Sequence, residues 1–307
     1  MVKKLRVAFL LVAIAMLSIF AAACGSDNTA SSTPTPVTGL GTPGAYTCQK
    51  GSITAAGSTA LQPLVSAVAK KYQAKCSGST ITVNLGGSGA GLTAAENGTA
   101  DIGDSDIFSK PGQEDLVDHQ VAVVVFTVMI NSQVTGVTSL TTDQIKAIYS
   151  GQTTNWKALG GPDLPIVVVS RPSSSGTRAT FQKYVLGGAV ESITGPDNLT
   201  TDSTGTVISN VQQTAGAIGY AASGPAKQFG LTILKIDNVE ATPDNVKSNK
   251  YKFWNIEHMY TKGPAKSLAQ ALIDYMVSPD GLAAAQTLDF IAITDISQAT
   301  LKTHQTH

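Results

Sequence analysis

Charged residues are scarce in this 307-residue sequence, and neither sign is in excess. Asp, Glu, Lys and Arg together make up 14% of the chain, and the 21 acidic residues balance the 21 Lys and Arg residues. No cluster of Lys or Arg alternates with aromatic residues, which is the pattern of a surface that binds nucleic acid. The composition therefore argues against nucleic acid as a partner.

Residues with catalytic or metal-binding spacing are also lacking. The histidines are scattered, without the spacing of metal ligands, and two of them lie in the polar C-terminal tail: His119, His258, His304 and His307. The chain contains neither a G-x-S-x-G turn nor a G-x-x-x-x-G-K-[ST] loop. We therefore expect no enzyme activity, no metal and no cofactor.

Long apolar runs are few, and the first of them, residues 7–20, follows a positively charged start. This run is too short to cross a membrane comfortably, and three alanines stand between it and Cys24. The pattern predicts a lipoprotein signal peptide over residues 1–23 and acylation of Cys24, which would anchor an extracytoplasmic protein to the cell membrane. Cleavage after Ala23 without lipid attachment is the alternative, and it also leads to export.

The sequence has only three cysteines. If Cys24 carries lipid, Cys48 and Cys76 remain as an even pair in an oxidising compartment. We therefore predict a disulfide between Cys48 and Cys76. Two buried free thiols are the alternative.

Composition changes sharply after the signal segment. Residues 24–47 are rich in Ser, Thr, Pro and Gly and have very little to bury, so we expect a flexible tether there. The remaining length is enough for two lobes of ordinary domain size. The 42% hydrophobic content and the 29 glycines suit a compact α/β protein with many tight turns.

Beyond the tether, short apolar strands alternate with helical patterns, which is typical of βαβ units and of a mostly parallel sheet flanked by helices. The first set has expected strands over residues 51–55, 80–84 and 100–103, with helical patterns over 61–72 and 89–97. The second set has expected helices over residues 142–149, 177–186 and 207–214, with strands over 166–170 and 217–221.

The longest strand-like apolar run, residues 121–130, is expected to pass from one lobe to the other. The chain then returns near residues 251–260. We therefore predict that lobe 1 comprises residues 48–127 and 251–307, and that lobe 2 comprises residues 128–250.

Three turns share one pattern, in which a strand ends in small hydroxyl and glycine residues just before a helix. They are AGST over residues 56–59, GGSG over 86–89 and SSSGT over 173–177. A helix N-terminus offers unpaired N–H donors and a partial positive charge, and glycine lets the backbone approach a ligand closely. Each turn alone is more often a plain helix cap. Three in one chain, on both expected lobes, indicate an oxyanion site.

Two charged residues lie at strand ends next to these turns. Arg171 follows the strand over residues 166–170 and could bind a tetrahedral anion with two parallel hydrogen bonds, although a lone arginine is more often part of a surface ion pair. Asp106 follows the strand over residues 100–103 and could equally cap the next turn. A carboxylate beside an anion can accept a hydrogen bond from a ligand that still carries a proton, and it repels a ligand without one.

Six stretches in order carry a family resemblance: AGSTALQPL, VNLGGSGAGL, ADIGDSD, LTTDQIKAIYSGQTTNW, SRPSSSGTRATF and GAIGYA. Together they resemble the phosphate-binding proteins of bacterial high-affinity phosphate ABC transporters, within the type II periplasmic-binding-protein family. The resemblance covers nearly the whole chain after the tether. It implies two α/β lobes joined by crossover strands, with phosphate held between them and delivered to the permease subunits of an ABC transporter. We expect the protein to be a monomer.

The same resemblance implies which residues bind phosphate, with Ala60 acting through its main chain: Thr59, Ala60, Ser88, Asp106, Arg171, Ser175, Gly176 and Thr177. In this assignment Asp106 accepts the phosphate proton. The sequence departs from the family at Ala60, where an aromatic residue is common, at Asp104, where a small residue is common, and at Ser173, where an acidic residue is common.

Two kinds of alternative remain open at this point. The ligand could be another oxyanion, such as sulfate, molybdate or tungstate, although Asp106 disfavours a fully deprotonated dianion. The protein could also be a phosphate-site phosphatase, or a sensor without a transporter.

Overall fold

The computed structural model describes residues 46–192, 195 and 198–305, which belong to one compact unit. The predicted signal peptide, the lipid site at Cys24 and all but the end of the tether lie outside the described residues. Within the described part, none of the helices combines the length and the apolar character needed to span a bilayer.

Most strands of the described part join in a sheet with the order β2-β1-β3-β10-β4-β8-β6-β7, while β5, β9 and β11 pair beside this path. The strands are β1 (Gly51–Gly57), β2 (Ser79–Leu85), β3 (Ile102–Ser105), β4 (Leu116–Ile130), β5 (Ser139–Leu140), β6 (Val167–Ser170), β7 (Leu199–Thr200), β8 (Ala217–Ala222), β9 (Thr232–Ile236), β10 (Trp254–Lys262) and β11 (Ile291–Ala292).

Helices follow most of the strands in the chain. They are α1 (Gln62–Lys75), α2 (Ser88–Asn97), α3 (Thr142–Tyr149), α4 (Gly176–Tyr184), α5 (Thr204–Gln213), α6 (Ser223–Gln228), α7 (Pro243–Lys247), α8 (Ser267–Met276), α9 (Pro279–Thr287) and α10 (Gln298–Lys302), with short 3₁₀ turns η1 (Trp156–Leu159) and η2 (Ile293–Asp295). The mixed α/β architecture with helices around a sheet confirms the expected fold class.

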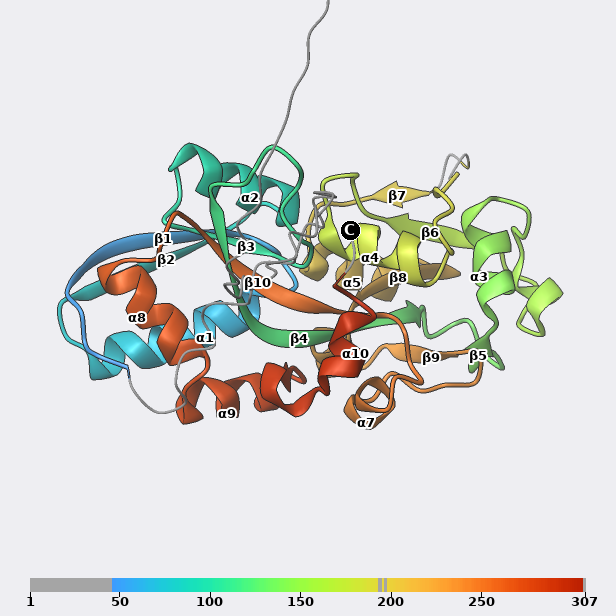
Figure 1. The fold of residues 1–307 in the computed structure, drawn as a ribbon. Helices are drawn as coiled ribbons and strands as arrows, with labels where there is room; N and C mark the ends of the chain where they lie inside the picture. Colours follow the sequence, from blue (N-terminus) through green and yellow to red (C-terminus); the bar gives the residue numbers. More distant parts are fainter. Residues whose placement is uncertain (1–45, 193–194, 196–197, 306–307) are drawn as a thin grey trace, which may run out of the picture. The chain divides into compact units, whose positions relative to one another are not determined.

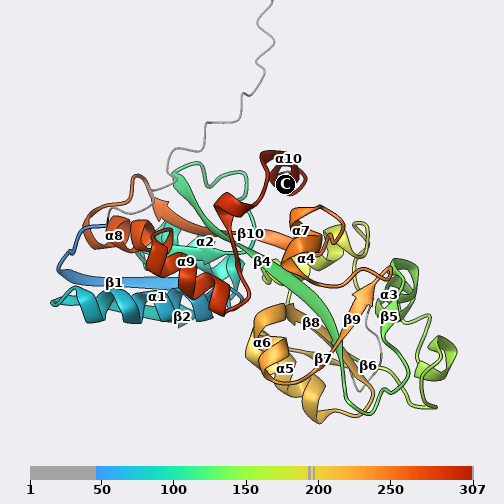
Figure 2. The same cartoon turned by 90° about the horizontal axis from the view of Figure 1, so that it is seen from below.

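Strand β4 takes part in two groups of strands (Figures 1 and 2). Residues 116–125 of β4 pair with β10, and residues 126–130 pair with β8. We call β1, β2, β3, β10, β11 and the start of β4, with the turns and helices α1 and α2 that follow β1 and β2, the first region. The end of β4 with β6, β7, β8 and β9, and the turns and helices α4 and α5 that follow β6 and β7, form the second region. Neighbours are parallel at β2-β1-β3 and at β8-β6-β7, and antiparallel where β4 and β10 join the two regions. The lobe boundaries given above remain a prediction.

Side-chain alternation along β8 divides the core of the second region into two layers. Ile218 and Tyr220 pack in the same cluster as Phe181 of α4, whereas Ala217 and Ala221 pack with Val207 of α5. Because successive residues of a strand point to opposite faces, α4 and α5 cover opposite faces of this part of the sheet. Both helices begin at the carboxyl end of a parallel strand, where ligands bind in open α/β sheets.

Cys48 and Cys76 form the predicted disulfide, with their Cα atoms 5.0 Å apart. The bond joins the segment before β1 to the residue that follows α1.

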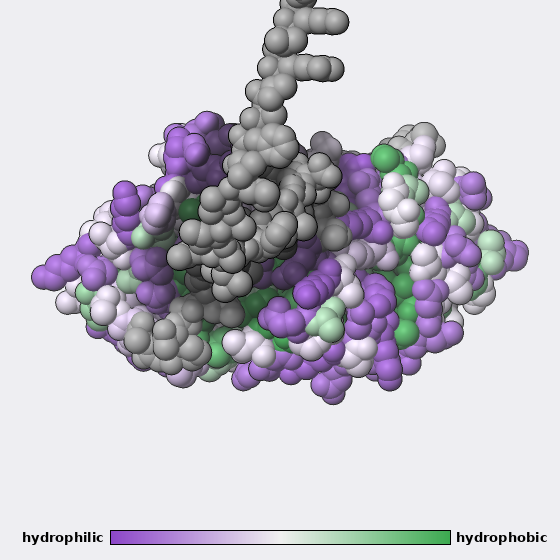
Figure 3. Space-filling view, in the orientation of Figure 1, coloured by the Kyte–Doolittle hydropathy of each residue, from purple (hydrophilic) through white to green (hydrophobic). Residues whose placement is uncertain are grey.

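The two tryptophans, Trp156 and Trp254, are fully buried in the main hydrophobic cluster. The part of the surface that is visible in Figure 3 is mostly hydrophilic, with hydrophobic residues in a vertical band on the right of the view and in a smaller area at its lower middle.

Candidate functional site

All three glycine and serine turns join a strand to a helix, as the sequence predicts: β1 to α1, β2 to α2 and β6 to α4. Only the third has a hydroxyl side chain as its helix cap, because Ser175 accepts a hydrogen bond from the Arg178 N–H at 3.3 Å. Helices α1 and α2 have no side-chain cap bond at their N-termini. In the turn before α1, however, Ser58 Oγ accepts from the Ala60 and Leu61 N–H groups at 3.1 and 3.0 Å. Local capping therefore accounts for the third turn and for Ser58 in the first turn, and it leaves the second turn unexplained.

Glycine is required in the first turn by its backbone and its surroundings. Gly57 has a φ of +140°, and a Cβ atom there would lie 2.1 Å from the carbonyl oxygen of Asp104. Residues 55–57 of β1 pair in parallel with residues 102–104 of β3. The ends of the two strands are therefore in contact, which places the turn after β1 beside Asp106.

Asp106 is 2% exposed, and hydroxyl groups from both regions bind its carboxylate. Ser58 Oγ donates to Asp106 Oδ1, and Thr177 Oγ1 donates to Oδ2 at 2.9 Å. The Asp106 N–H donates to Ser88 Oγ at 3.0 Å, and its carbonyl oxygen accepts from Asn255 Nδ2 at 2.6 Å. The Asp106 carboxylate thus binds hydroxyl groups of the first and third turns.

Arg171 is 1% exposed and is not part of a surface ion pair. Its Nη2 atom donates to Thr59 Oγ1 at 3.1 Å and to the carbonyl oxygen of Asp202 at 2.9 Å, and its Nε atom donates to the carbonyl oxygen of Thr201 at 3.1 Å. Its Nη1 atom is buried and has no hydrogen-bond partner among the described residues. Burial lowers the pKa of Arg171, while the charge of Asp106 acts in the opposite direction.

The start of α4 packs directly against the first region. A Cβ atom at Gly176 would lie 2.4 Å from Ser88 Oγ and 3.0 Å from Asp106 Cβ. The Gly89 N–H also donates to the carbonyl oxygen of Ser174 at 3.0 Å. These contacts mean that the second and third turns meet face to face, which the sequence could only suggest.

The structure therefore brings the predicted site residues together. Direct contacts connect Thr59 with Arg171, Ser88 with Asp106 and Asp106 with Thr177. Ala60 and Ser175 are buried next to Thr59 and Gly176, and the Ala60 N–H donates to Ser58 Oγ at 3.1 Å.

Sequence reasoning missed several residues of this neighbourhood. Ser58 stands in the first turn but was given no role. Thr204, at the start of α5, donates its N–H to Thr59 Oγ1 at 3.1 Å. Asn255 of β10 binds the Asp106 carbonyl and also Thr180 Oγ1 at 3.0 Å. A Ser-x-x-Thr cap pattern at residues 203–206 could have revealed the start of α5, whereas nothing local distinguishes Asn255.

Two further carboxyl groups lie buried near Asp106. Asp104 and Glu257 are 1% and 0% exposed, and none of their carboxyl oxygens has a hydrogen-bond partner within the described residues. His258 pairs with Ser105 across β10 and β3, so Glu257 faces the position of Asp106 on the same side of the sheet. Burial and the Asp106 charge raise the pKa values of both Asp104 and Glu257 well above their ordinary values.

A fourth buried carboxyl group, that of Glu191, belongs to a network that reaches the main chain of Arg171. Glu191 accepts hydrogen bonds from Ser170 Oγ and from the Tyr220 hydroxyl, the latter at 2.7 Å, and lies 3.4 Å from Arg178 Nε. Arg178 Nη1 in turn donates to the Arg171 carbonyl oxygen at 2.7 Å. Burial raises the pKa of Glu191, while Ser170, Tyr220 and Arg178 act to lower it. This network fixes the backbone at Arg171.

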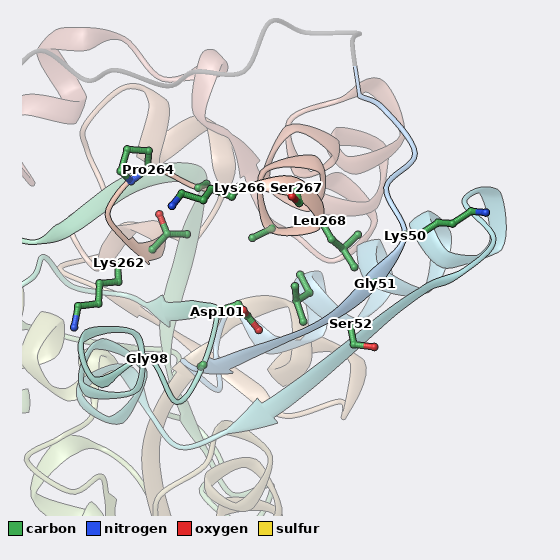
Figure 4. Close-up of a pocket in the computed structure, with 15 residues that line it drawn as sticks. Lys50, Gly51, Ser52, Gly98, Asp101, Lys262, Pro264, Lys266, Ser267 and Leu268 are labelled. Atoms are coloured by element: carbon green, nitrogen blue, oxygen red, sulfur yellow. The ribbon is translucent and has the colours of Figure 1, made fainter.

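A cavity of about 400 Å³ lies away from these residues, between the start of β1, the end of β10 and the start of α8 (Figure 4). Its charged groups do not converge: Lys262 Nζ donates to the Glu96 carbonyl oxygen, and Asp101 accepts from the Thr54 N–H. Across the described part of the chain, no group of three or more His, Cys, Asp or Glu residues is arranged to hold a metal ion. The network around Asp106 and Arg171 is therefore the candidate site.

The chain is similar in sequence to known proteins. A family model described as the PBP superfamily domain matches residues 41–280. The phosphate-binding protein PstS of Bacillus subtilis is 43% identical over 234 residues, which is 75% of this chain and 76% of that protein.

Solved structures give the same result. A protein from Clostridium perfringens, described as a phosphate ABC transporter substrate-binding protein and crystallised with bound phosphate, has a TM-score of 0.74 and 32% identity, covering 79% of this chain and 100% of that one. An ABC-type phosphate transport receptor from Vibrio cholerae has a TM-score of 0.63 and 25% identity, covering 78% and 99%. The chain therefore belongs to the PBP superfamily and, within it, to the PstS family of phosphate-binding proteins.

Proposed function

We propose that this chain is the extracytoplasmic solute-binding component of a phosphate ABC transporter, and that it binds inorganic phosphate between the first and second regions. The relatives named above are phosphate-binding proteins, and one of them was crystallised with phosphate. The residues expected to bind phosphate are Thr59, Ala60, Ser88, Asp106, Arg171, Ser175, Gly176 and Thr177.

The observation that carries the proposal is the burial of one arginine and one carboxylate in a single set of contacts between the two regions. Arg171 keeps a buried Nη1 atom without an acceptor among the described residues. Such a donor is costly unless an acceptor arrives, and an anion with several oxygens supplies one. The guanidinium then provides the formal charge that a desolvated anion needs.

Asp106 would provide the selectivity for phosphate. A carboxylate has about four lone-pair positions, and Ser58 and Thr177 use two of them. The remaining lone pairs of Asp106 can accept a hydrogen bond from the proton that phosphate still carries near neutral pH. Sulfate has no proton to donate and would be repelled by the carboxylate charge. A phosphate ligand is favoured over sulfate, molybdate and tungstate for this reason.

We also propose that the chain is not an enzyme. The family is one of solute-binding proteins. Among the described histidines, none is hydrogen-bonded to Asp106 or Arg171, since His119 lies at Thr261 and His304 at the Lys252 carbonyl oxygen. His258 Nδ1 is engaged with Asp118 at 2.7 Å, and strand alternation puts His258 on the opposite face of β10 from Glu257. Ser175 and Thr177 are used as a helix cap and as an Asp106 ligand.

One titration tests the proposal. The purified chain lacking residues 1–24 is titrated calorimetrically with phosphate, arsenate, sulfate and molybdate. We expect tight binding of phosphate and of arsenate, which keeps a proton at neutral pH, and much weaker binding of sulfate and molybdate. Equal affinities, or no heat with phosphate, would contradict the proposal.

Export and anchoring are proposed from the sequence alone. Acylation of Cys24 would hold the protein at the membrane, with residues 24–47 as the tether, and the soluble part is expected to be a monomer that contacts the permease subunits. Labelling cells with an alkyne-tagged fatty acid should tag the full chain but not its Cys24→Ser variant. Label on the variant would count against a lipid at Cys24.

A further inference from the structure

The Thr59 hydroxyl group is the meeting point of three contacts from the second region. Arg171 Nη2 and the Thr204 N–H both donate to Thr59 Oγ1, each at 3.1 Å, and Thr204 Oγ1 lies 3.2 Å from the same atom. Thr59 and Thr204 are 6% and 3% exposed, so bulk water does not replace these contacts. An oxygen atom of one region is thus held where donors of the other region converge.

The capacity of a hydroxyl group determines which way the third hydrogen bond runs. A threonine oxygen has two acceptor lone pairs and one hydrogen. Arg171 and the Thr204 N–H use both lone pairs of Thr59, so the Thr59 hydrogen must point to Thr204 Oγ1. The Thr59 hydroxyl is then fully used, and the phosphate contact expected of Thr59 falls to its main-chain N–H. The hydrogen of the Thr204 hydroxyl is then left without an acceptor, because its only hydrogen-bond contact within the described residues is Thr59.

A second donor at the same place also lacks an acceptor. Arg171 Nη1 belongs to the guanidinium that binds Thr59 through Nη2, and no described residue accepts from Nη1. Two buried donors, Arg171 Nη1 and the Thr204 hydroxyl, are therefore arranged around one threonine oxygen. A ligand that satisfies both must offer several acceptor oxygens, which is the chemistry of an oxyanion.

We propose that Thr204 is a further phosphate-binding residue, which donates its hydroxyl hydrogen to a phosphate oxygen from the N-terminus of α5. This inference rests on the proposed function, because it assigns an additional residue to the same site. Helix α5 has ten residues and is capped by Ser203, so its first turn is ordered, and its positive end would lie beside a phosphate bound by Thr204.

Calorimetric titration with inorganic phosphate tests the inference. Thr204→Val keeps the branched shape but lacks the hydroxyl, and we expect its dissociation constant to rise roughly tenfold, the effect of one hydrogen bond to a charged group. Thr204→Ser should recover most of the lost affinity. Thr206→Val is the matched control. Thr206 is exposed on the same helix, its side chain bonds only Ser203 among the described residues, and its N–H keeps the Ser203 cap bond after the substitution. This variant should bind phosphate as the unaltered chain does.

A chain that already carries Thr59→Val shows whether Thr204 contacts phosphate directly or acts only through Thr59. If Thr204 binds phosphate, Thr204→Val weakens binding in that background as well, whereas no further loss there means that Thr204 acts only through Thr59 and overturns the inference. Unchanged affinity of Thr204→Val in the otherwise unaltered chain also overturns it. Should that variant not fold, a phosphate-bound crystal structure of the unaltered chain decides, by the presence or absence of a phosphate oxygen within hydrogen-bond distance of Thr204 Oγ1. If the unaltered chain binds no phosphate, the proposed function itself fails.

Discussion

Asp106 and Arg171 differ from ordinary charged residues because both are almost completely buried. A buried charge is tolerated when hydrogen bonds and an opposite charge compensate for lost hydration. Asp106 has two hydroxyl donors, and Arg171 has two backbone carbonyls and a threonine. The side chains that would contact the ligand are thus fixed before it binds, which reduces the entropy cost of binding.

Substitution of Arg171 tests the countercharge. We expect Arg171→Ala to raise the dissociation constant for phosphate by at least roughly a hundredfold, because truncating one partner of a buried charged pair costs several kcal/mol. Arg171→Lys keeps the charge but not the planar fork and should lose less. Calorimetry provides the measurement, and an unchanged affinity of the alanine variant would exclude Arg171 from the site.

Substitution of Asp106 tests the proton acceptor. We expect Asp106→Asn to narrow the ratio of phosphate to sulfate affinity by about tenfold or more, because the amide no longer repels sulfate and offers fewer acceptor positions to the phosphate proton. A competition titration at neutral pH measures the ratio. The same ratio in the variant and the unaltered chain would show that Asp106 does not select the ligand.

At the scale of elements, the N-termini of helices position the residues of the candidate site. Helices α1, α2 and α4 begin beside the site, as the sequence predicts, and α5 begins there too. The predicted helix over residues 207–214 starts too late, because apolar periodicity becomes visible only at Val207. Its first turn is polar, and the cap at Ser203 sets the observed start at Thr204.

The close approach of α4 to the first region depends on Gly176. A methyl group at this position would meet Ser88 Oγ at 2.4 Å and push the helix start away from Asp106. We expect Gly176→Ala to weaken phosphate binding by about 1–3 kcal/mol, the usual cost of overpacking. Gly205→Ala is the control, because a Cβ atom there meets nothing within 4 Å. Equal affinity of both variants would mean that the two regions do not approach this closely when phosphate is bound.

At the scale of the whole molecule, the buried carboxyl groups of Asp104 and Glu257 make the free energy of unfolding depend on pH. Their raised pKa values mean that the folded chain keeps protons that the unfolded chain releases above a pH of about 4. As the pH rises from about 4 towards the pKa values of these groups in the folded chain, the free energy of unfolding should therefore fall. The decrease is up to about 1.4 kcal/mol per pH unit for each group. The Asp106 charge adds to the effect.

Denaturant unfolding of the phosphate-free chain between pH 5 and 8 checks this expectation. The double variant Asp104→Asn with Glu257→Gln removes both titrations and should give a flatter profile than the unaltered chain. Asp143→Asn changes a side chain that is 96% exposed and should leave the profile as it is. Parallel profiles for the double variant and the unaltered chain would show that these carboxyls do not titrate differently in the folded state.

Local sequence was enough to determine the α/β class, the disulfide and the three glycine-bearing turns that join strands to helices. Strand ends, helix starts and small residues between them are features of a few neighbouring residues, and they follow from backbone sterics and hydrogen bonding. Only the tertiary structure decided that Ser58, Thr204, Asn255 and Glu257 surround Asp106 and Thr59. Long-range strand pairing and packing bring these residues together across the two regions, and no local pattern records which distant side chains will meet.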